Sequence, residues 1–389
     1  MPTAPQEPEP QERKHWKHLY EEVVATDICV GCAACVVACP HHVIEMDAFR
    51  PTMQDLTLGQ DNCVHGEKSC SLCAMACLRL DPAYEAMEEL LFGRRRKHPS
   101  EPWGMHREMW LARAHDDAIR PRGQDGGVVT ALLAWMLETE QVEGACVSKP
   151  IEQTPWFDEP YVATTRAELI EAAGSRYTYC STPLALKIAA ERKMRSVALV
   201  GVSCESTAIR EMAVEGIKRW SRMVKFVAGL MCNETFAYEP FINEVVVGRY
   251  GIAIERVVKI NVKGDVFVTL DDGSDIVIPL AECKPFANEW CHHCPDFAAE
   301  HADISFGGLG MNGWTMCVVR TEYGQDLWGR AVAAGVLETR MATEEPEALR
   351  VLDALAKKQR RRVDPFDPHA LGRWGSREVL ERVRREAKQ

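Results

Sequence analysis

The sequence predicts an α/β protein in which a small cysteine-rich segment precedes a larger domain of alternating strands and helices. Residues 24–80 hold eight of the sixteen cysteines. Residues 122–340 alternate strand-sized apolar runs with helical runs, a pattern typical of a largely parallel sheet. Residues 257–280 instead alternate apolar and polar side chains between glycine turns, which predicts a β-meander at the edge of the large domain.

Composition divides the chain into five parts. Residues 1–23 form a tail rich in proline and charge, which predicts disorder. The cysteine-rich segment at 24–80 is followed by a connector at 81–121 and then by the large domain at 122–340. A charged extension at 341–389 ends in a run that reads as a helix.

The large domain is expected to place two cysteines at the ends of neighbouring strands. Helices are expected at 128–138, 184–192 and 241–249, and strands near Ala145, at 196–203 and at 225–231. The last two strands end next to Cys204 and Cys232. Open α/β sheets build their sites at the carboxyl ends of strands, so this edge is a candidate site.

Charge and composition exclude several classes of protein. The formal net charge is −11, whereas a nucleic-acid-binding surface normally shows a basic excess. The acidity is either a solubility bias or a docking face for a redox partner. No apolar run approaches the roughly 18 residues of a membrane span, and the N-terminal residues lack the apolar core of a secretory signal. A cytoplasmic location follows, and clustered cysteines in a reducing compartment are typical metal ligands.

The first cysteine run is Cys29-x2-Cys32-x2-Cys35-x3-Cys39, closed by Pro40. This spacing wraps three thiolates around one iron–sulfur cube and points the fourth toward a second cube. Small residues between the ligands let backbone amides approach the sulfurs and stabilise the negative charge of the cube.

The second run, Cys63-x6-Cys70-x2-Cys73-x3-Cys77, repeats the spacing with an insertion after its first cysteine. A two-cluster arrangement assigns Cys29, Cys32, Cys35 and Cys77 to one 4Fe-4S cube, and Cys39, Cys63, Cys70 and Cys73 to the other. The alternatives are zinc and unbound thiols. Structural zinc sites usually pair two C-x2-C knuckles, and a triple run closed by Cys-Pro is not their pattern.

A third four-cysteine site is possible in the large domain. Cys204 and Cys232 follow apolar strands, and Cys291 and Cys294 form a C-x2-C pair. These four converge if the pair lies at the same edge of the sheet; the alternative is that the strand-end cysteines are core residues. Cys146 and Cys317 lie within apolar strands and are expected in the core, whereas Cys180 and Cys283 suggest no role.

Three glycine-containing loops are candidates for binding a nucleotide cofactor. The first precedes a helix, whose free N–H groups favour a pyrophosphate, although it matches neither the G-x-G-x-x-G nor the Walker pattern. Its candidate residues are Gln124, Asp125, Gly126, Gly127, Val129 and Thr130; those of the other loops are Gly174, Arg176, Tyr177, Thr178, and Gly308, Gly310, Gly313, Trp314. Arg176 is a candidate phosphate ligand, and Tyr177 or Trp314 a stacking ring. The alternative for each loop is a surface turn with a packed aromatic.

Five ordered stretches of the large domain resemble the beta subunit of coenzyme F420-reducing hydrogenase and its relatives. They read GQDGGVVTALLAWMLE, EAAGSRYTYCSTP, ALVGVSCESTAIREM, AGLMCNETFAYE and WCHHCPDFAAEHADISFGGLG followed by MNGW. The preceding two-cluster segment is similar to the F420H2-dehydrogenase and F420-dependent sulfite reductase branches. The chain departs from the family at Ser203, where proline is frequent, and at Glu205, where glutamine is frequent.

The resemblance implies a bound FAD, with the deazaflavin F420 stacked on it, and one 4Fe-4S cluster held by Cys204, Cys232, Cys291 and Cys294. The three loops match the flavin-binding segments of the family. A flavin takes up a hydride and returns its two electrons singly, and each cluster carries one electron. With three clusters, the implied function is an oxidoreductase subunit that links F420 to a hydrogenase, dehydrogenase, reductase or ferredoxin in a hetero-oligomeric complex.

Two other functions remain open at this stage. One is a ferredoxin-linked electron-transfer module that feeds a separate reductase without F420. The other is direct reduction of an organic substrate at the flavin.

Overall fold

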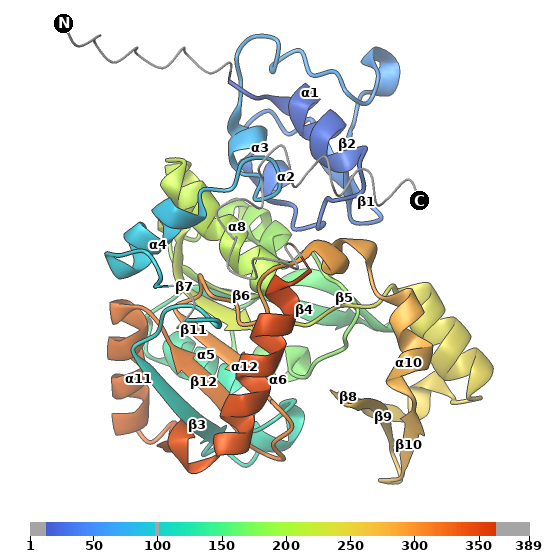
Figure 1. Ribbon diagram of the computed structural model, residues 1–389, viewed down its shortest axis with the longest axis vertical. Helices are drawn as coiled ribbons and strands as arrows, with labels where there is room; N and C mark the ends of the chain where they lie inside the picture. Colours follow the sequence, from blue (N-terminus) through green and yellow to red (C-terminus); the bar gives the residue numbers. More distant parts are fainter. Residues whose placement is uncertain (1–12, 98–100, 363–389) are drawn as a thin grey trace, which may run out of the picture.

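The computed structural model describes residues 13–97 and 101–362. Figure 1 shows the cysteine-rich segment, in blue, at one end of the molecule, above a large sheet covered by helices, with a small separate group of strands, β8–β10, to one side. The expected α/β class, with its N-terminal cysteine-rich segment, is confirmed.

The cysteine-rich segment is a compact unit of short helices and one hairpin. Its elements are α2 (Ala34–Ala38), β1 (Ile44–Asp47), β2 (Arg50–Met53) and α3 (Leu72–Met75). Before it lie α1 (Trp16–Leu19) and a wide helical turn (Tyr20–Val24), and after it the connector forms α4 (Tyr84–Phe92). Residues 14–23 therefore differ from the polar tail expected there. Trp16, Leu19 and Val23 are almost fully buried and pack with the cysteines, because these apolar side chains close the core of the segment. Residues 1–12 lie outside the described part.

The main sheet has eight strands in the order β13-β3-β12-β11-β7-β6-β4-β5. Their bounds are β3 Glu108–Ala114, β4 Gly144–Ile151, β5 Thr154–Ala163, β6 Val197–Val202, β7 Val224–Leu230, β11 Ile304–Gly307, β12 Thr315–Val319 and β13 Leu337–Met341. The four central strands are parallel, as expected, but both flanks are antiparallel. The expectation of a largely parallel sheet was wrong at the flanks, where a short turn joins β4 to β5 and allows only antiparallel pairing.

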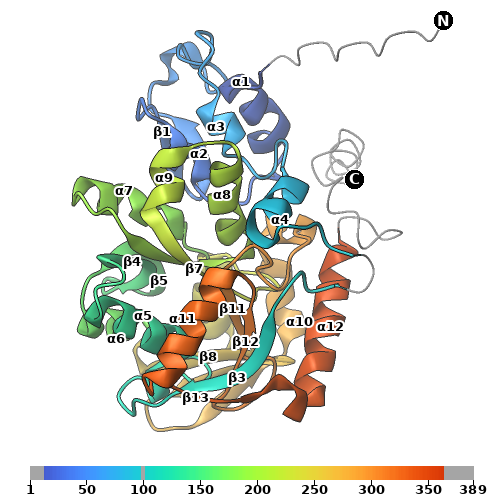
Figure 2. The same cartoon turned by 90° about the vertical axis from the view of Figure 1, so that its left-hand side faces the viewer.

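Helices cover both faces of the sheet. One face carries α5 (Val128–Glu138), α6 (Arg166–Ala172) and α11 (Glu322–Ala333). The other carries α7 (Ala185–Glu191), α8 (Ser203–Val214) and α9 (Lys218–Met223), and Figure 2 shows α8 between the sheet and the cysteine-rich segment. The helix expected at 128–138 has the expected bounds, and the one expected at 184–192 is shorter by one residue at each end.

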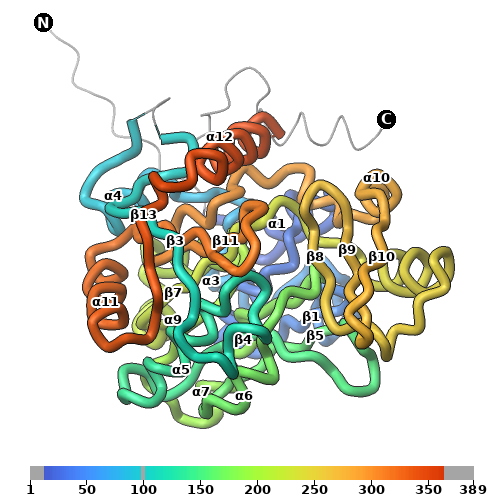
Figure 3. Tube along the Cα trace, turned by 90° about the horizontal axis from the view of Figure 1, so that it is seen from below, coloured from blue at the N-terminus to red at the C-terminus, as the bar shows by residue number. Residues whose placement is uncertain are grey.

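The expected β-meander is present but forms a sheet of its own. Strands β8 (Val257–Lys263), β9 (Asp265–Leu270) and β10 (Asp275–Ile278) pair antiparallel, and Figure 3 shows them beside α10 (Leu280–Cys283). Their apolar face packs against a wide, π-type helix at Glu239–Arg249, where an α-helix was expected.

The C-terminal extension begins with α12 (Pro346–Arg360), which packs against β3 and β12. The helix expected at the end of the extension lies beyond residue 362, outside the described residues. Within the described residues, no helix is long and apolar enough to cross a membrane.

Candidate cluster sites and cofactor loops

The first candidate cluster site is a cavity in the cysteine-rich segment. Cys29, Cys32, Cys35 and Cys77 all line it, together with apolar side chains and Arg79. The chain turns sharply at Gly31, whose φ is +68° and where an added Cβ would lie 2.8 Å from the carbonyl oxygen of Phe49. A residue without a side chain is therefore required between the first two cysteines. Burial raises the pKa of the Cys77 thiol to about 12.

The second group of cysteines lies in the same segment. Burial raises the pKa of Cys73 to about 12, and the neighbouring thiols of Cys39, Cys70 and Cys63 add to the rise. The insertion does not separate Cys63 from the others, because its loop folds back on itself. The backbone N–H of Cys70 donates to the carbonyl of His65 at 2.9 Å, and that of Glu67 to the carbonyl of Cys63 at 3.1 Å. The structure thus brings the four cysteines expected for the second cube together.

The third group lines a cavity where the large domain meets the cysteine-rich segment. Cys204, Cys232, Cys291 and Cys294 share this cavity. Strands β6 and β7 are parallel neighbours with Val202 opposite Leu230, so the cysteines that follow them emerge at one edge of the sheet. Two hydroxyl groups face the thiols: Tyr179 Oη lies 3.7 Å from Cys204 Sγ, and Thr235 Oγ1 lies 3.6 Å from Cys291 Sγ.

The Cys29 group and the third group each line a cavity. Across residues 13–97 and 101–362, no three His, Cys, Asp or Glu side chains form a group that could hold a lone metal ion. Four thiols around a cavity suit a multi-iron cube better than one tetrahedral zinc ion. Cys146 and Cys317 lie fully buried in β4 and β12, as expected of core residues.

The glycine loop before α5 is held by the meander. Gly126 and Gly127 both have positive φ, and Gly127 caps α5 without a side-chain hydrogen bond to its first turn. Lys259 Nζ donates to the carbonyl oxygen of Gln124 at 2.6 Å, and Lys263 Nζ lies 3.1 Å from Asp125 Oδ1. Neither lysine was among the residues predicted from the sequence. The alternation of side chains along β8 could have indicated them, because it places residues 259, 261 and 263 on one face of the strand.

The other two loops meet the first. The side chain of Gln124 donates to Tyr177 Oη at 3.2 Å. Burial raises the pKa of Tyr177 to about 12, so its hydroxyl is neutral. A Cβ on Gly308 would lie 2.1 Å from Asp125 Oδ2, so the third loop touches the first at a glycine. The three segments expected to bind a cofactor therefore converge on one another.

Arg176 and Trp314 both contact charged side chains of the protein. Arg176 Nε lies 3.1 Å from Asp158 Oδ1, and its Nη1 donates to the carbonyl of Ala172 at 3.0 Å. The ring of Trp314 lies against two guanidinium groups, with Arg113 Cζ 4.6 Å and Arg340 Cζ 4.5 Å from the ring centroid, so arginines already stack on it.

The other candidate residues of the loops occupy ordinary positions of the fold: a hydrogen bond to the backbone, the first turn of a helix, or a glycine turn. Thr178 Oγ1 donates to the carbonyl of Trp156 at 3.0 Å. Thr130 is buried in the first turn of α5, next to the half-buried Val129. Gly174, Gly310 and Gly313 all have positive φ, the conformation that glycine adopts most readily.

Comparison with known proteins decides the family. Residues 109–187 match the N-terminal model, and residues 194–345 the C-terminal model, of the coenzyme F420 hydrogenase/dehydrogenase beta subunit. These ranges cover more than half of the 389 residues. The chain belongs to the coenzyme F420 hydrogenase/dehydrogenase beta subunit family. Residues 28–79 also match a 4Fe-4S dicluster domain, a range that includes all eight cysteines of the N-terminal segment.

Individual members of the family show the same relationship. The chain is 33% identical over 270 residues to the coenzyme F420 hydrogenase subunit beta of Methanothermobacter thermautotrophicus, covering 67% of this chain and 94% of the relative. It is 28% identical over 351 residues to the coenzyme F420-dependent sulfite reductase of Methanocaldococcus jannaschii, covering 87% of this chain and 50% of that protein. A chain from the F420-reducing NiFe hydrogenase complex of Methanosarcina barkeri superposes with a TM-score of 0.65 at 29% identity, covering 70% of this chain and 97% of that one.

The end of α12 reaches the third cavity from outside the range that matches the family. Gln359 lines the cavity, and its amide donates to the carbonyls of Cys232 at 3.1 Å and Asp296 at 3.2 Å. Arg362 Nη1 donates to the carbonyl of Cys291 at 2.9 Å. Sequence reasoning missed both residues, because nothing in a charged helical extension indicates where it packs.

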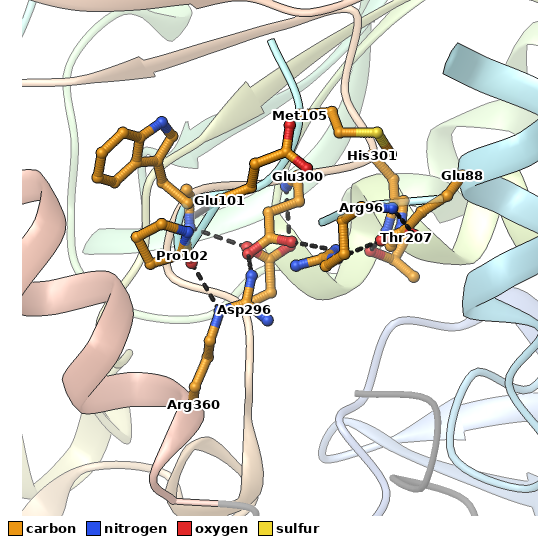
Figure 4. A network of polar contacts seen from close by, with 12 residues as sticks. Glu88, Arg96, Glu101, Pro102, Met105, Thr207, Asp296, Glu300, His301 and Arg360 are labelled. Atoms are coloured by element: carbon orange, nitrogen blue, oxygen red, sulfur yellow. Dashed lines mark hydrogen bonds and ion pairs between the residues drawn. The ribbon is translucent and has the colours of Figure 1, made fainter. Parts of the chain in front are cut away.

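A buried ionic network holds the segment that follows Cys294. Figure 4 shows Glu300 between Arg96 of the connector and Arg360 of α12, and the structure contains both ion pairs. Burial alone would raise the pKa of Glu300, but the two guanidinium groups outweigh it and lower the pKa to about 2. The carboxylate is therefore charged, and it ties the connector and the C-terminal helix to the chain that follows the third cysteine group.

Proposed function

We propose that this chain is an FAD- and iron–sulfur-dependent oxidoreductase subunit of the cytoplasm. It exchanges a hydride with coenzyme F420 and single electrons with a partner redox protein. The observation that carries the proposal is the cavity lined by Cys204, Cys232, Cys291 and Cys294. This cavity adjoins the one lined by Cys29, Cys32, Cys35 and Cys77, and Val30 lines both.

The cysteines fit three 4Fe-4S clusters, one for each group. A cluster ligand is a thiolate, whereas burial raises the pKa of Cys291 to about 11, so its free thiol is neutral at pH 7. Cluster assembly would therefore release protons, and the charge of the iron replaces them. The hydroxyl groups of Tyr179 and Thr235 are placed to donate to the sulfurs of the third cluster.

FAD would supply the conversion between a hydride and two single electrons. Support for its position comes from the three converging loops. The N–H groups at the start of α5 and the ammonium groups of Lys259 and Lys263 present positive charge beside the glycine loop, where a pyrophosphate would lie. Tyr177 is a neutral, fixed ring in the same region, and it is a better candidate to contact the isoalloxazine than Trp314, which arginines cover.

The cavities suggest a path for single electrons. The third group adjoins the Cys29 group, and the neighbouring Cys32 adds to the burial that raises the pKa of Cys204. Cys73 of the remaining group acts in turn on Cys35. Electrons would pass from the third cluster to the Cys29 cluster and then to the Cys39 cluster, or in reverse. A similar solved chain belongs to a hydrogenase complex. We infer that the present chain is also part of a hetero-oligomeric complex.

Anaerobic purification, with iron, sulfide and flavin quantified, tests the cofactors. About twelve irons, twelve sulfides and one FAD per chain are expected. Incubation with reduced F420 and a dye acceptor then tests the reaction. No dye reduction with cofactors intact would refute the F420 assignment, and reduction by reduced ferredoxin alone would favour the ferredoxin-linked module. A colourless anaerobic preparation that contains zinc or no metal would refute the cluster assignment.

A further inference from the structure

We propose that Arg79 couples the Cys29 cluster to the third cluster as a positioning residue. This inference rests on the proposed function, because it concerns how two of the clusters act on each other. Arg79 follows Cys77 by two residues, lines the cavity of the Cys29 group, and is 1% exposed. It is one of the largest fully buried side chains among the described residues.

The guanidinium of Arg79 reaches across to the loop that carries the third cysteine group. Its Nη1 donates to the carbonyl of His293 at 2.7 Å, and its Nη2 lies 3.5 Å from the carbonyl of Trp290. Trp290 directly precedes Cys291, and His293 directly precedes Cys294. The side chain of Arg79 therefore lines the Cys29 cavity and also binds the backbone next to two cysteines of the third group.

The charge of Arg79 lies at the wall of the Cys29 cavity and is hydrogen-bonded to the loop of the third group. A 4Fe-4S cube with four thiolates carries net negative charge, which grows when the cube is reduced. A buried cation between two such cubes favours the reduced form of each, because burial weakens the screening of its charge. Arg79 should therefore raise both reduction potentials.

The two terminal nitrogens of the guanidinium, which form a fork, give Arg79 a geometric role as well. Two parallel N–H groups that hold two carbonyls of one loop keep that loop at a set distance from the Cys29 cavity. The step that depends on this distance is one electron passing between the two cubes: one is oxidised by one electron, the other is reduced by one, and no bond or proton changes place. Loss of the fork should weaken the magnetic interaction between the two reduced clusters.

Arg362 provides a matched comparison. It also binds the Cys291 loop, but from the residues that follow α12, and its Nη1 donates to the carbonyls of Cys291 at 2.9 Å and of Asn233 at 2.7 Å. Its charge acts on Cys232 and Cys291 of the third group. Replacing Arg79 should thus change the reduction potentials of two clusters, whereas replacing Arg362 should change the potential of one.

The experiment is a potentiometric titration of the full-length, anaerobically purified protein, followed by electron paramagnetic resonance. Arg79→Gln should lower the potentials of the Cys29 and third clusters, leave the Cys39 cluster unchanged, and weaken the splitting between the first two. Arg79→Lys keeps a charge but loses the fork, so it should give a smaller change in the same two clusters. Arg362→Gln should lower the potential of the third cluster alone.

Unchanged potentials in Arg79→Gln, an equal fall in all three clusters, or the same pattern in Arg362→Gln would overturn the proposal. If Arg79→Gln does not retain its clusters, Arg79→Lys decides, and wild-type potentials with wild-type splitting in that variant would refute the role of Arg79. The cofactor content of the wild-type protein tests the proposed function separately. Three clusters with no effect of Arg79 would refute this inference and leave that function standing.

Discussion

Lys263 Nζ lies 3.1 Å from Asp125 Oδ1, so a strand of the separate meander is bonded directly to the loop that opens α5. The same ammonium donates to the carbonyl of Met311 at 3.1 Å and to Asn312 Oδ1 at 2.9 Å. One side chain therefore joins the meander to two of the three loops proposed to hold FAD.

Replacement of this lysine should loosen the flavin. Lys263→Met removes three hydrogen bonds and a positive charge beside the proposed pyrophosphate, so FAD per chain after gel filtration should fall several-fold while iron stays at the wild-type value. Lys225→Met, at an exposed position of β7, is the control and should retain both. Wild-type flavin content in Lys263→Met would contradict the placement of FAD at these loops.

The contact between the first and third loops predicts a second effect on flavin content. In Gly308→Ala the new Cβ would lie 2.1 Å from Asp125 Oδ2, so the Asp125 side chain must leave its contact with Lys263 or one of the two loops must shift. We expect lower FAD content, measured from the absorbance of the released flavin. Gly329→Ala, in α11, is a suitable control because an added Cβ there meets no atom within 4 Å. Equal flavin in the two variants would show that this approach of the loops does not matter for binding.

The third cluster can be removed alone. Cys204→Ser replaces one proposed ligand of that cube, and we expect about four fewer irons per chain with the two N-terminal clusters retained. Colorimetric iron analysis with electron paramagnetic resonance measures both quantities. Cys317→Ala removes a fully buried thiol from β12 and should leave the iron unchanged. An unchanged iron content in Cys204→Ser would eliminate the third site.

The buried network around Glu300 should dominate the attachment of α12. Glu300→Gln leaves Arg96 and Arg360 without their shared carboxylate, and breaking a buried pair in this way costs about 3–5 kcal/mol. We expect a large fall in the urea midpoint of unfolding followed by circular dichroism. Glu338→Gln breaks an exposed pair with Arg113 and should leave the midpoint almost unchanged. Similar midpoints for the two variants would show that the network contributes little.

The same carboxylate predicts a pH dependence. The pKa of Glu300 is lowered from its ordinary value of 4.5 to about 2 in the folded chain. Its contribution to stability is therefore complete above pH 4.5 and is lost as the pH falls toward 2. The difference in urea midpoint between wild type and Glu300→Gln should be constant from pH 7 to about 5 and smaller at about pH 3. A difference that grows on acidification would contradict this sign.

Much of the architecture followed from local pattern. The bounds of α5 were predictable because an apolar helical run follows directly on two glycines, and the strands β6 and β7 because short apolar runs end at turn residues. The meander was predictable from the alternation of its strands. The antiparallel flanks of the main sheet were not, because the pairing partner of a strand depends on segments far away in the chain.

Within the candidate site, too, some features could be predicted from the sequence and others could not. Arg176 and Trp314 have the residue types that cofactors favour, but contacts with Asp158 and with two arginines already engage them. Conversely, Lys263 and Gln359 reach the candidate sites from β8 and α12. The alternation of β8 indicates only which face Lys263 occupies, and nothing in the sequence of α12 indicates where Gln359 packs.

The sequence by itself determined the iron–sulfur character of this protein, because ligands such as Cys29, Cys32 and Cys35 lie within one turn of chain, where spacing alone decides which way each sulfur points. Only the tertiary structure decided that Cys204 and Cys232 share a cavity with the Cys291 loop, and that Arg79 and Arg362 bind that loop from opposite ends of the chain. These contacts result from the parallel pairing of β6 with β7 and from side-chain hydrogen bonds between residues as many as 214 positions apart. The spacing of residues along the sequence does not indicate these contacts, because each depends on how the whole chain packs.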